Sequence, residues 1–191
     1  MAKLSTMEEL FLDEIRDLYD AERQLTRALP EMAGAASSDE LRDVFEEHLE
    51  QTHNHIQRLE RIFEVLGEKA TGKKCAAMTG LIKEGNEIVS ASDETTVRDA
   101  GLIAAAQKVE HYEISGYGSA RTHAEILGDE KAARLLDETL FEEREADERL
   151  NDLALNLINE QAAGESAERD TRVGGGRSKV KVAGRSSVDE F

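Results

Sequence analysis

In the stretch IAAAQKVEHYEISGYGSARTHA, residues 103–124, one helical face mixes apolar and acidic residues. Read at steps of three and four residues, this face contains Ile103, Ala106, Glu110, Glu113, Tyr117, Ala120, Ala124 and then Leu127. Small and aliphatic side chains at this spacing are typical of a helix face that packs into a core. The pattern therefore predicts two carboxylates, those of Glu110 and Glu113, inside the protein.

A second helical segment, nearer the C-terminus, shows the same combination. Its inward positions are Leu136, Leu140, Glu143, Asp147, Leu150, Ala154 and Leu157. An unpaired carboxylate that leaves water costs several kcal/mol, so buried acids require protons, basic partners or a bound cation. Neither face carries a lysine or arginine at an inward position. The sequence therefore indicates that something other than a basic side chain neutralises these acids.

The composition is typical of one helical domain. The chain has 191 residues, a single proline, no tryptophan and 34% charged residues, which favours an all-α fold. Its net charge of −17 argues against nucleic acid or an anionic membrane as a partner, because both repel a polyanion. No segment approaches the ~20 apolar residues of a membrane helix. Because Cys75 is the lone cysteine and no secretory signal pattern is present, we expect a cytoplasmic protein.

Periodicity and helix-end signals predict four long helices and one short helix. Ser5 with Glu8 forms a capping-box pattern for the first helix, which we expect to kink or end at Pro30. Ser37 with Glu40 indicates the start of the second helix. The expected helices cover about residues 5–29, 37–66, 75–90, 97–127 and 129–162.

Two long helical hairpins, joined by a connection of about 30 residues, predict a ferritin-like four-helix bundle. The long crossover between the second and third long helices carries the extra short helix. We expect the bundle over residues 1–163 and a disordered tail, rich in glycine, serine and charge, over residues 164–191. Glu110 lies 18 residues before Gly128 and Glu143 lies 15 after it, so both reach nearly the same level of the bundle.

Carboxylates that converge with an imidazole inside a helical bundle are suitable ligands for a pair of iron or manganese ions. The predicted metal ligands are Glu22, His48, Glu110, Glu113, Glu143 and Asp147. We expect Glu113 and Glu143 to bridge the two ions and the other side chains to bind at the ends. Open positions on such a centre would admit oxygen or peroxide.

The second long helix offers two alternatives for its ligand. Glu50 and His53 match the Glu-x-x-His pattern of di-iron bundles. At ~100° per residue, however, Glu50 points almost directly away from the apolar face and His53 lies well off it. The inward polar residues are His48, Thr52 and His55. We therefore favour His48 as the ligand, against the alternatives of a hydrogen-bonded core histidine or of a rotated helix that uses Glu50 and His53.

Five motifs carry a resemblance to a known family. They are DLYDAE (17–22), ALP (28–30), HLEQT (48–52), AAAQKVEHYE (104–113) and ETLFEE (138–143). In these motifs the chain resembles the YciE/YciF family of stress-associated bacterial proteins. The resemblance extends over most of the chain and does not include the C-terminal tail.

The resemblance, which covers about residues 4–162, implies a fold similar to those of rubrerythrin and bacterioferritin, a homodimer and ferroxidase activity. The ligands that it implies are Glu22, Glu110, Glu113 and Glu143. The chain departs from the ferritin-like pattern at Ala146, where a Glu-x-x-His motif would place a histidine. Asp147 is then the substitute ligand on this helix.

Two functions follow from these observations. The first is a ferroxidase or peroxide-consuming protein with a carboxylate-bridged di-iron or di-manganese centre. The alternative is a non-enzymatic, dimeric helical stress protein whose buried acids are protonated or hydrogen-bonded and hold no metal. Stoichiometric metal in the purified protein would separate the two.

Overall fold

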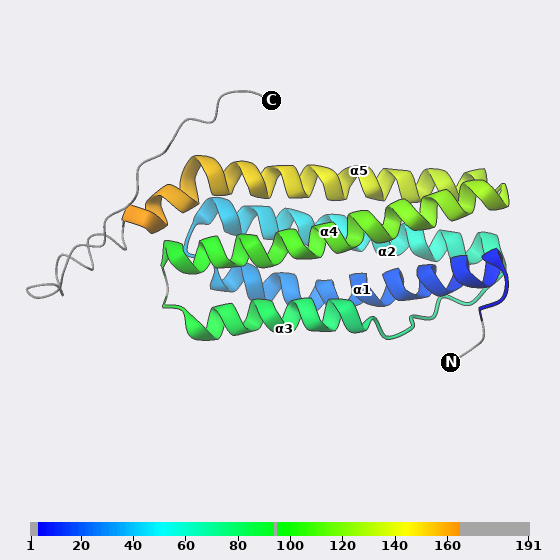
Figure 1. Ribbon diagram of the computed structural model, residues 1–191, viewed down its shortest axis with the longest axis horizontal. Helices are drawn as coiled ribbons and strands as arrows, with labels where there is room; N and C mark the ends of the chain where they lie inside the picture. The colour runs from blue at the N-terminus through cyan, green and yellow to red at the C-terminus, as the bar shows by residue number, and fades with distance from the viewer. Residues whose placement is uncertain (1–3, 94, 165–191) are drawn as a thin grey trace, which may run out of the picture.

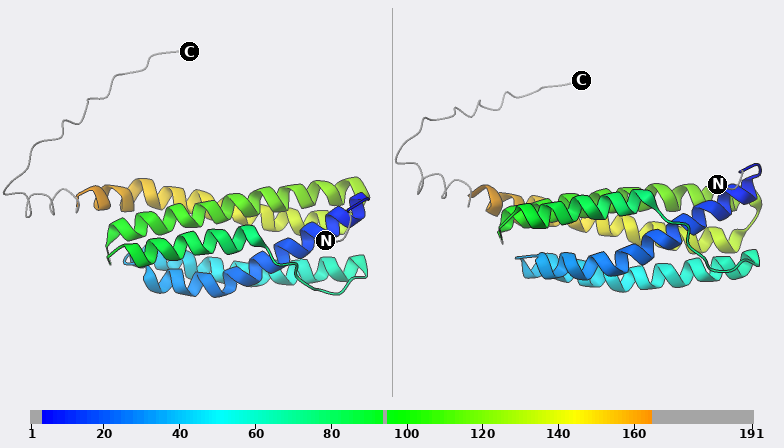
Figure 2. Two further views of the ribbon diagram at one scale, coloured as in Figure 1. Left: turned by 60° about the horizontal axis from the view of Figure 1, so that its bottom comes forward. Right: turned by 90° about the horizontal axis from the view of Figure 1, so that it is seen from below.

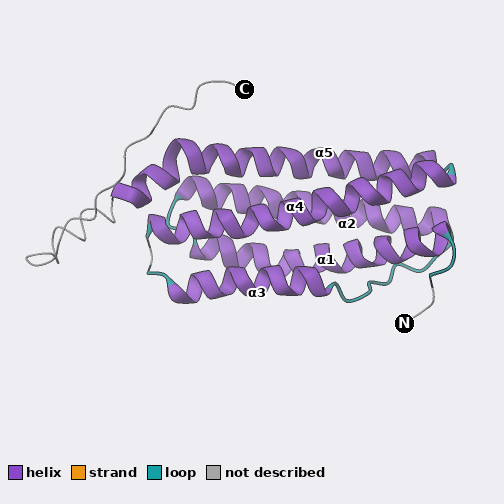
Figure 3. Ribbon diagram, in the orientation of Figure 1, coloured by secondary structure: helices purple, strands orange, loops and turns teal. Residues whose placement is uncertain are grey.

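The computed structural model describes residues 4–93 and 95–164, and all its regular elements in these ranges are helices (Figure 3). The elements are α1 (Met7–Ala35), α2 (Asp39–Leu66), α3 (Ala76–Ala91), α4 (Thr96–Leu127), α5 (Glu130–Leu153) and a π-helical turn (Ala154–Ile158). The predicted all-α fold class is confirmed. Within the described part of the chain, no helix has both the length and the apolar character needed to cross a membrane. The predicted tail after Gly164 lies outside the described residues.

Four long helices run side by side as a bundle, and the short helix α3 lies along its outside (Figure 1). α1 packs on α2, and α4 packs on α5, so each sequential pair forms a hairpin. The chain leaves α2 at one end of the bundle, runs along its side, and forms α3 against α1 and α4 (Figure 2). This is the predicted bundle with one long crossover that carries an extra helix.

The first helix begins one residue later than the capping pattern predicted. The Thr6 side chain accepts a hydrogen bond from the Glu9 backbone N–H, and the Glu9 carboxylate accepts one from the Thr6 backbone. The backbone N–H of Ser5 also donates to Glu9, at 2.6 Å. The capping box is therefore Thr6 with Glu9 and not Ser5 with Glu8, because two adjacent hydroxyl residues both fitted the pattern.

The interior of α1 tolerates its proline. Pro30 lies inside the helix, which continues to Ala35 and thus passes the end at Leu29 that the sequence predicted. A proline within a helix removes one backbone hydrogen bond. Burial of Ala33 and Ala35 beyond it shows that the last turn packs into the core, which offsets this loss. The α1–α2 hairpin therefore turns only at residues 36–38.

Polar residues separate the core into two apolar clusters. One cluster includes Leu25, Phe45 and Leu150, and the other includes Leu18, Leu59, Tyr117 and Leu140, among further side chains. On each bundle helix, the buried glutamates and histidines lie in sequence between residues of the two clusters. The four helices therefore present one polar layer near the middle of the bundle, as the equal levels predicted.

A close approach between α1 and α4 lies beside this layer. A Cβ atom added to Gly116 would lie 2.8 Å from Cδ2 of Leu18, which is closer than side-chain packing permits. Glycine at this position therefore lets α1 approach α4 closely. The approach brings Glu22, one turn beyond Leu18, toward the carboxylates of α4.

A buried aspartate fixes the turn between α1 and α2. The two carboxylate oxygens of Asp99, on α4, accept hydrogen bonds from the backbone N–H groups of Ser37 (2.8 Å) and Ser38 (2.9 Å). Ser38, and not the predicted Ser37, is the N-cap of α2, and its side chain accepts from the Leu41 N–H. One acid thus joins both hairpins at the end of the bundle.

Replacement of Asp99 by alanine is expected to lower the free energy of unfolding by about 2–3 kcal/mol, because it leaves two backbone donors unpaired. Urea unfolding followed by circular dichroism measures this change. Asp43→Ala, at an exposed position of α2, is the matched control and should change stability by less than about 0.5 kcal/mol. Equal losses in the two variants would show that Asp99 does not fix the turn.

Candidate metal centre

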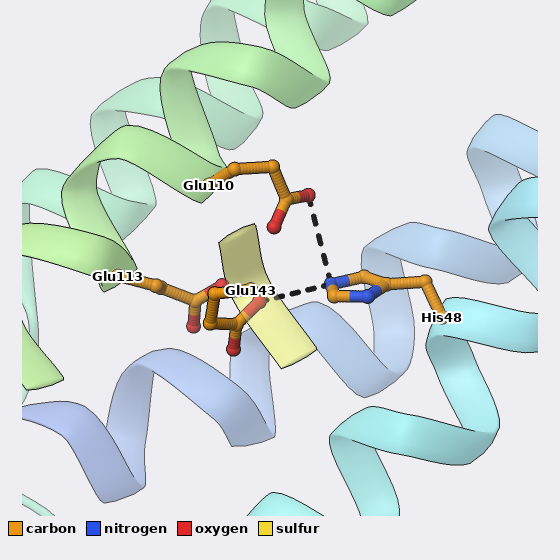
Figure 4. Close-up of side chains that lie close together, drawn as sticks. All are labelled: His48, Glu110, Glu113 and Glu143. Carbon is orange, nitrogen blue, oxygen red and sulfur yellow. Dashed lines mark ion pairs between the residues drawn. The ribbon is translucent and has the colours of Figure 1, made fainter. Parts of the chain in front are cut away.

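The central layer gathers six buried ligand-type side chains from all four bundle helices. They are Glu22 of α1, His48 and His55 of α2, Glu110 and Glu113 of α4, and Glu143 of α5. None of them is more than 4% exposed to solvent. Figure 4 shows four of them turned toward one another between α2, α4 and α5. The structure therefore brings together five of the six predicted ligands and adds one histidine.

These side chains form two groups that share one carboxylate. In the first group, ligand atoms of His48, Glu110, Glu113 and Glu143 all lie within 4.8 Å of one another. In the second group, the same limit holds for Glu22, His55 and Glu143. Two adjacent groups with a common carboxylate match the arrangement in which one acid bridges two ions. Glu143 therefore fits the predicted bridging role, whereas Glu113 belongs only to the first group.

Most of the ligand atoms in this layer have no hydrogen-bond partner. The unpartnered atoms are Glu22 Oε2, His48 Nε2, His55 Nδ1, Glu110 Oε2 and both carboxylate oxygens of Glu113 and Glu143. The two histidine nitrogens in this set lie within ion-pair distance of the acids, but no hydrogen bond is formed. Buried polar atoms are almost always hydrogen-bonded in folded proteins, so a set of this size calls for a further partner. Carboxylate oxygens and imidazole nitrogens together suit iron and manganese.

The first histidine presents a free nitrogen to the acids. Nδ1 of His48 lies 3.2 Å from the side-chain oxygen of Gln51, which can only accept a hydrogen bond. Nδ1 is therefore the donor in this hydrogen bond, and Nε2 is the ring nitrogen that faces the acids. That atom lies 3.6 Å from Glu110 Oε1 and 3.8 Å from Glu143 Oε2. An outer hydrogen bond that fixes the tautomer is typical of metal-binding histidines.

The second histidine, His55, is also held from outside the layer, in this case by the carboxylate of Glu142. Nε2 of His55 lies 2.8 Å from Glu142 Oε2, and Arg58 donates to both oxygens of Glu142 at 2.7 Å. Burial raises the pKa of Glu142, but the hydrogen bonds from His55 and Arg58 outweigh it and lower the pKa to about 2. Glu142 is therefore ionised. Nδ1 of His55 points inward and lies 3.1 Å from Glu143 Oε1 and 3.2 Å from Glu22 Oε1.

Without a cation, protons must balance the charge of the layer. Burial lowers the pKa of His55, but the charge of Glu22 and the neighbouring acids outweigh it and raise the pKa to about 12. Burial, together with the charge of Glu143, raises the pKa of Glu110 well above its usual value. Burial and then Glu22 raise the pKa of Glu113 in the same direction. Two divalent cations would carry the four positive charges that four carboxylates require.

A tyrosine orients the carboxylate of α1. Tyr117, which is fully buried, donates its hydroxyl proton to Oε1 of Glu22 in a short hydrogen bond. Burial, and then the charge of Glu22, raises the pKa of Tyr117 well above its usual value, so the hydroxyl keeps its proton. One oxygen of Glu22 is thereby held, and Oε2 remains for a ligand. The other two tyrosines make their hydrogen bonds outside the layer, Tyr19 with Glu60 and Tyr112 with Asp17.

The prediction that Asp147 belongs to the cluster is wrong. Its carboxylate accepts hydrogen bonds from the side-chain amide of Gln107 and from Nε2 of His111, each at 3.2 Å. The Asp147 side chain is 25% exposed. At about 100° per residue, Asp147 lies about 40° to one side of the direction of Glu143 and Ala146 about 60° to the other, and the packing of α5 turns the side of Ala146 inward. The buried residue in this turn is Ala146. A stripe read at steps of three and four allowed either position.

The side-chain directions predicted for α2 are those that the structure shows. His48 faces the acids, and Glu50 and His53 are exposed, as periodicity predicted. His55 was placed on the inward face but was not chosen as a ligand. The signal that could have identified it is its spacing of seven residues from His48, because two helical turns bring both side chains to one face.

Comparisons with known proteins place the chain in a family. The family model described as "Domain of unknown function (DUF892)" matches residues 6–163. Protein YciF of Escherichia coli (strain K12) is 49% identical over 160 residues, which cover 83% of this chain and 96% of YciF. The resemblance to YciE/YciF is therefore confirmed.

Solved structures agree with this assignment. The crystal structure of the E. coli stress protein YciF matches with a TM-score of 0.79 and 50% identity, and covers 82% of this chain and 99% of that one. YcfI from Rhodopseudomonas palustris matches with a TM-score of 0.77 and 44% identity over 80% of this chain and 98% of its own. A protein from Xanthomonas campestris, at 20% identity and a TM-score of 0.68 over 84% of this chain and 99% of its own, shares the fold. The chain therefore belongs to the DUF892 family, the family of the stress protein YciF.

Proposed function

We propose that this protein holds a carboxylate-bridged pair of iron or manganese ions in its central layer and uses them to oxidise Fe(II) or to consume peroxide. The observation that carries the proposal is the pair of ligand groups that share Glu143 and whose inward atoms have no hydrogen-bond partner. The relation to a stress protein agrees with such a role. The homodimer that the resemblance implied remains part of the proposal.

The ligands follow from the two groups. His48, Glu110 and Glu113 would hold one ion, Glu22 and His55 the other, and Glu143 would bridge them. This assignment replaces Asp147 by His55 and leaves Glu143 as the bridge. Bound iron or manganese would supply the redox chemistry that amino-acid side chains lack.

The protein's own residues would prepare and protect the site. Gln51 and Glu142 fix the tautomers of the two histidines, and Arg58 keeps Glu142 ionised. Tyr117 holds Glu22 in place. The two apolar clusters cover the layer from both sides along the bundle and restrict water. Cation binding must release the protons that the buried acids otherwise keep, so metal affinity should increase with pH.

A non-enzymatic role is the second candidate, and the charge balance of the layer favours it in one respect. A protonated His55 and neutral Glu110 and Glu113 would reduce the net charge of the buried layer without metal. A protein of this kind would contain no stoichiometric metal, and metal would not change its thermal stability.

Metal content tests the assignment of the bridge. Wild-type protein loaded with Fe(II) or Mn(II) is expected to contain about two ions per chain. Glu143→Gln should lose both ions, whereas Glu113→Gln should retain about one, because only the first group contains Glu113. Elemental analysis after gel filtration measures the content. Glu64→Gln, an exposed change on α2, is the control and should match the wild type.

Anaerobic Fe(II) loading followed by exposure to oxygen or peroxide tests the activity. The wild type is expected to oxidise Fe(II) faster than buffer does, and Glu143→Gln should lose this acceleration. The appearance of the Fe(III) absorbance measures the rate. Full metal content without accelerated oxidation by either oxidant would contradict the enzymatic part of the proposal and leave a structural metal site. A wild type without stoichiometric metal would favour the non-enzymatic role.

A buried ligand set should make the metal-free protein less stable than an apolar core. Glu113→Met is expected to raise the free energy of unfolding in chelator by about 1–3 kcal/mol, because it removes a buried carboxylate with no hydrogen-bond partner. Added Mn(II) should stabilise the wild type more than the variant. Urea unfolding with and without Mn(II) measures both effects.

The exposed substitution Glu64→Met is the control and should shift stability by less than about 0.5 kcal/mol. If Glu113→Met destabilised the metal-free protein, Glu113 would contribute to the fold and not only to a ligand.

A further inference from the structure

A surface hollow between α2 and α5 reaches the first ligand group. Its volume is about 370 Å³, and its buried lining includes His48, Glu110 and Ala146. His48 and Glu110 are also the two members of the central layer with measurable exposure, 4% and 2%, whereas the other four members are 0% exposed. The hollow therefore connects solvent with one side of the layer.

A small residue, Ala146, is part of the lining of this hollow. It lies one turn beyond Glu143, where a Glu-x-x-His motif would place a histidine, and its methyl group lines the hollow. A long side chain at this position would extend into the space between α2 and α5. The departure from the ferritin-like pattern therefore coincides with the opening, and the histidines of this centre come from α2 instead.

The outer lining of the hollow is acidic. Four exposed acids, Glu47, Glu145, Glu148 and Asp152, surround one exposed base, Arg149, so their net charge is −3. Arg149 donates a hydrogen bond to Glu47 across the opening, which pairs the one positive charge. Negative charge around a concave opening raises the local concentration of cations and repels anions.

The inner end of the hollow presents two atoms that bind cations. His48 and Glu110 line the hollow, and each carries a buried ligand atom just behind this lining, Nε2 and Oε2, that has no hydrogen-bond partner. Both belong to the first group, whose remaining members are Glu113 and Glu143. A cation that passes through the hollow therefore meets the first group before it meets the second, which lies beyond Glu143.

We propose that this hollow is the port through which hydrated divalent cations reach the centre, with the acids outside attracting them and Ala146 leaving the passage open. The inference rests on the proposed metal centre and adds the route and the charge class of what enters. Cations would fill the first group before the second.

Co(II) uptake by the metal-free, full-length protein tests the port, because the absorbance of bound Co(II) reports loading in a stopped-flow instrument. Ala146→Leu is expected to load about tenfold more slowly than the wild type, yet to reach the same final content. Glu145→Gln combined with Glu148→Gln should slow loading by about three- to tenfold at low salt, and high salt should remove the difference. The control, Glu31→Gln combined with Glu64→Gln, removes two exposed charges away from the hollow and should load like the wild type.

The outcomes separate the port from the centre. Unchanged loading rates in Ala146→Leu would overturn the port and leave the metal centre in place. If Ala146→Leu lost Co(II) altogether, the charge variant would decide, and an unchanged rate there would overturn the port. A wild type that binds no Co(II) would overturn the centre, and the port with it.

Discussion

Four carboxylates share the middle of this bundle, and the ion pairs that the described residues give them are with two histidines, His48 and His55. Because charge is costly in a core, positive charge has to reach the layer as protons or as cations. The rest of the site follows from this requirement. Gln51 and Glu142 each contact the outer ring nitrogen of one histidine, so that the other ring nitrogen faces the acids, and Arg58 pairs with Glu142 outside the groups. The layer therefore gathers buried carboxylate oxygens and ring nitrogens that have no hydrogen-bond partner.

The scaffold is built to hold the acids at one level against their mutual repulsion. An apolar cluster lies on each side of the layer along the bundle, and both clusters draw side chains from all four helices. Gly116 lets α1 approach α4, and Asp99 ties the α1–α2 turn to α4 at one end. These contacts lie outside the ligand groups. These contacts stabilise the fold and so offset the free-energy cost of burying the acids.

The helices contribute unequally to the central layer. Two histidines from α2 serve the two groups, and α5 contributes one acid and then an alanine. Read as a motif, Ala146 is a missing ligand. In three dimensions it is part of a hollow that joins the first group to an acidic surface. Membership of the YciF family establishes the relatives of this chain but not its reaction. The proposed chemistry rests on the residues of the central layer.

The sequence by itself determined the all-α fold, the order of the helices, the crossover and the inward direction of Glu22, His48, Glu110, Glu113 and Glu143. Hydrophobic periodicity carries this information, because it repeats over many turns and averages out local ambiguity. It could not separate Ser37 from Ser38 as a cap, since both side chains fit within one turn. Nor could it fix Asp147, because an inward stripe is wide enough to admit two neighbouring positions. Only the packing of α5 against α2 and α4 decided that Ala146 is buried and Asp147 bonds to Gln107 and His111. The role of His55 likewise depended on the tertiary structure, because Glu142 and Arg58, which orient it, come together only when α2 and α5 pack.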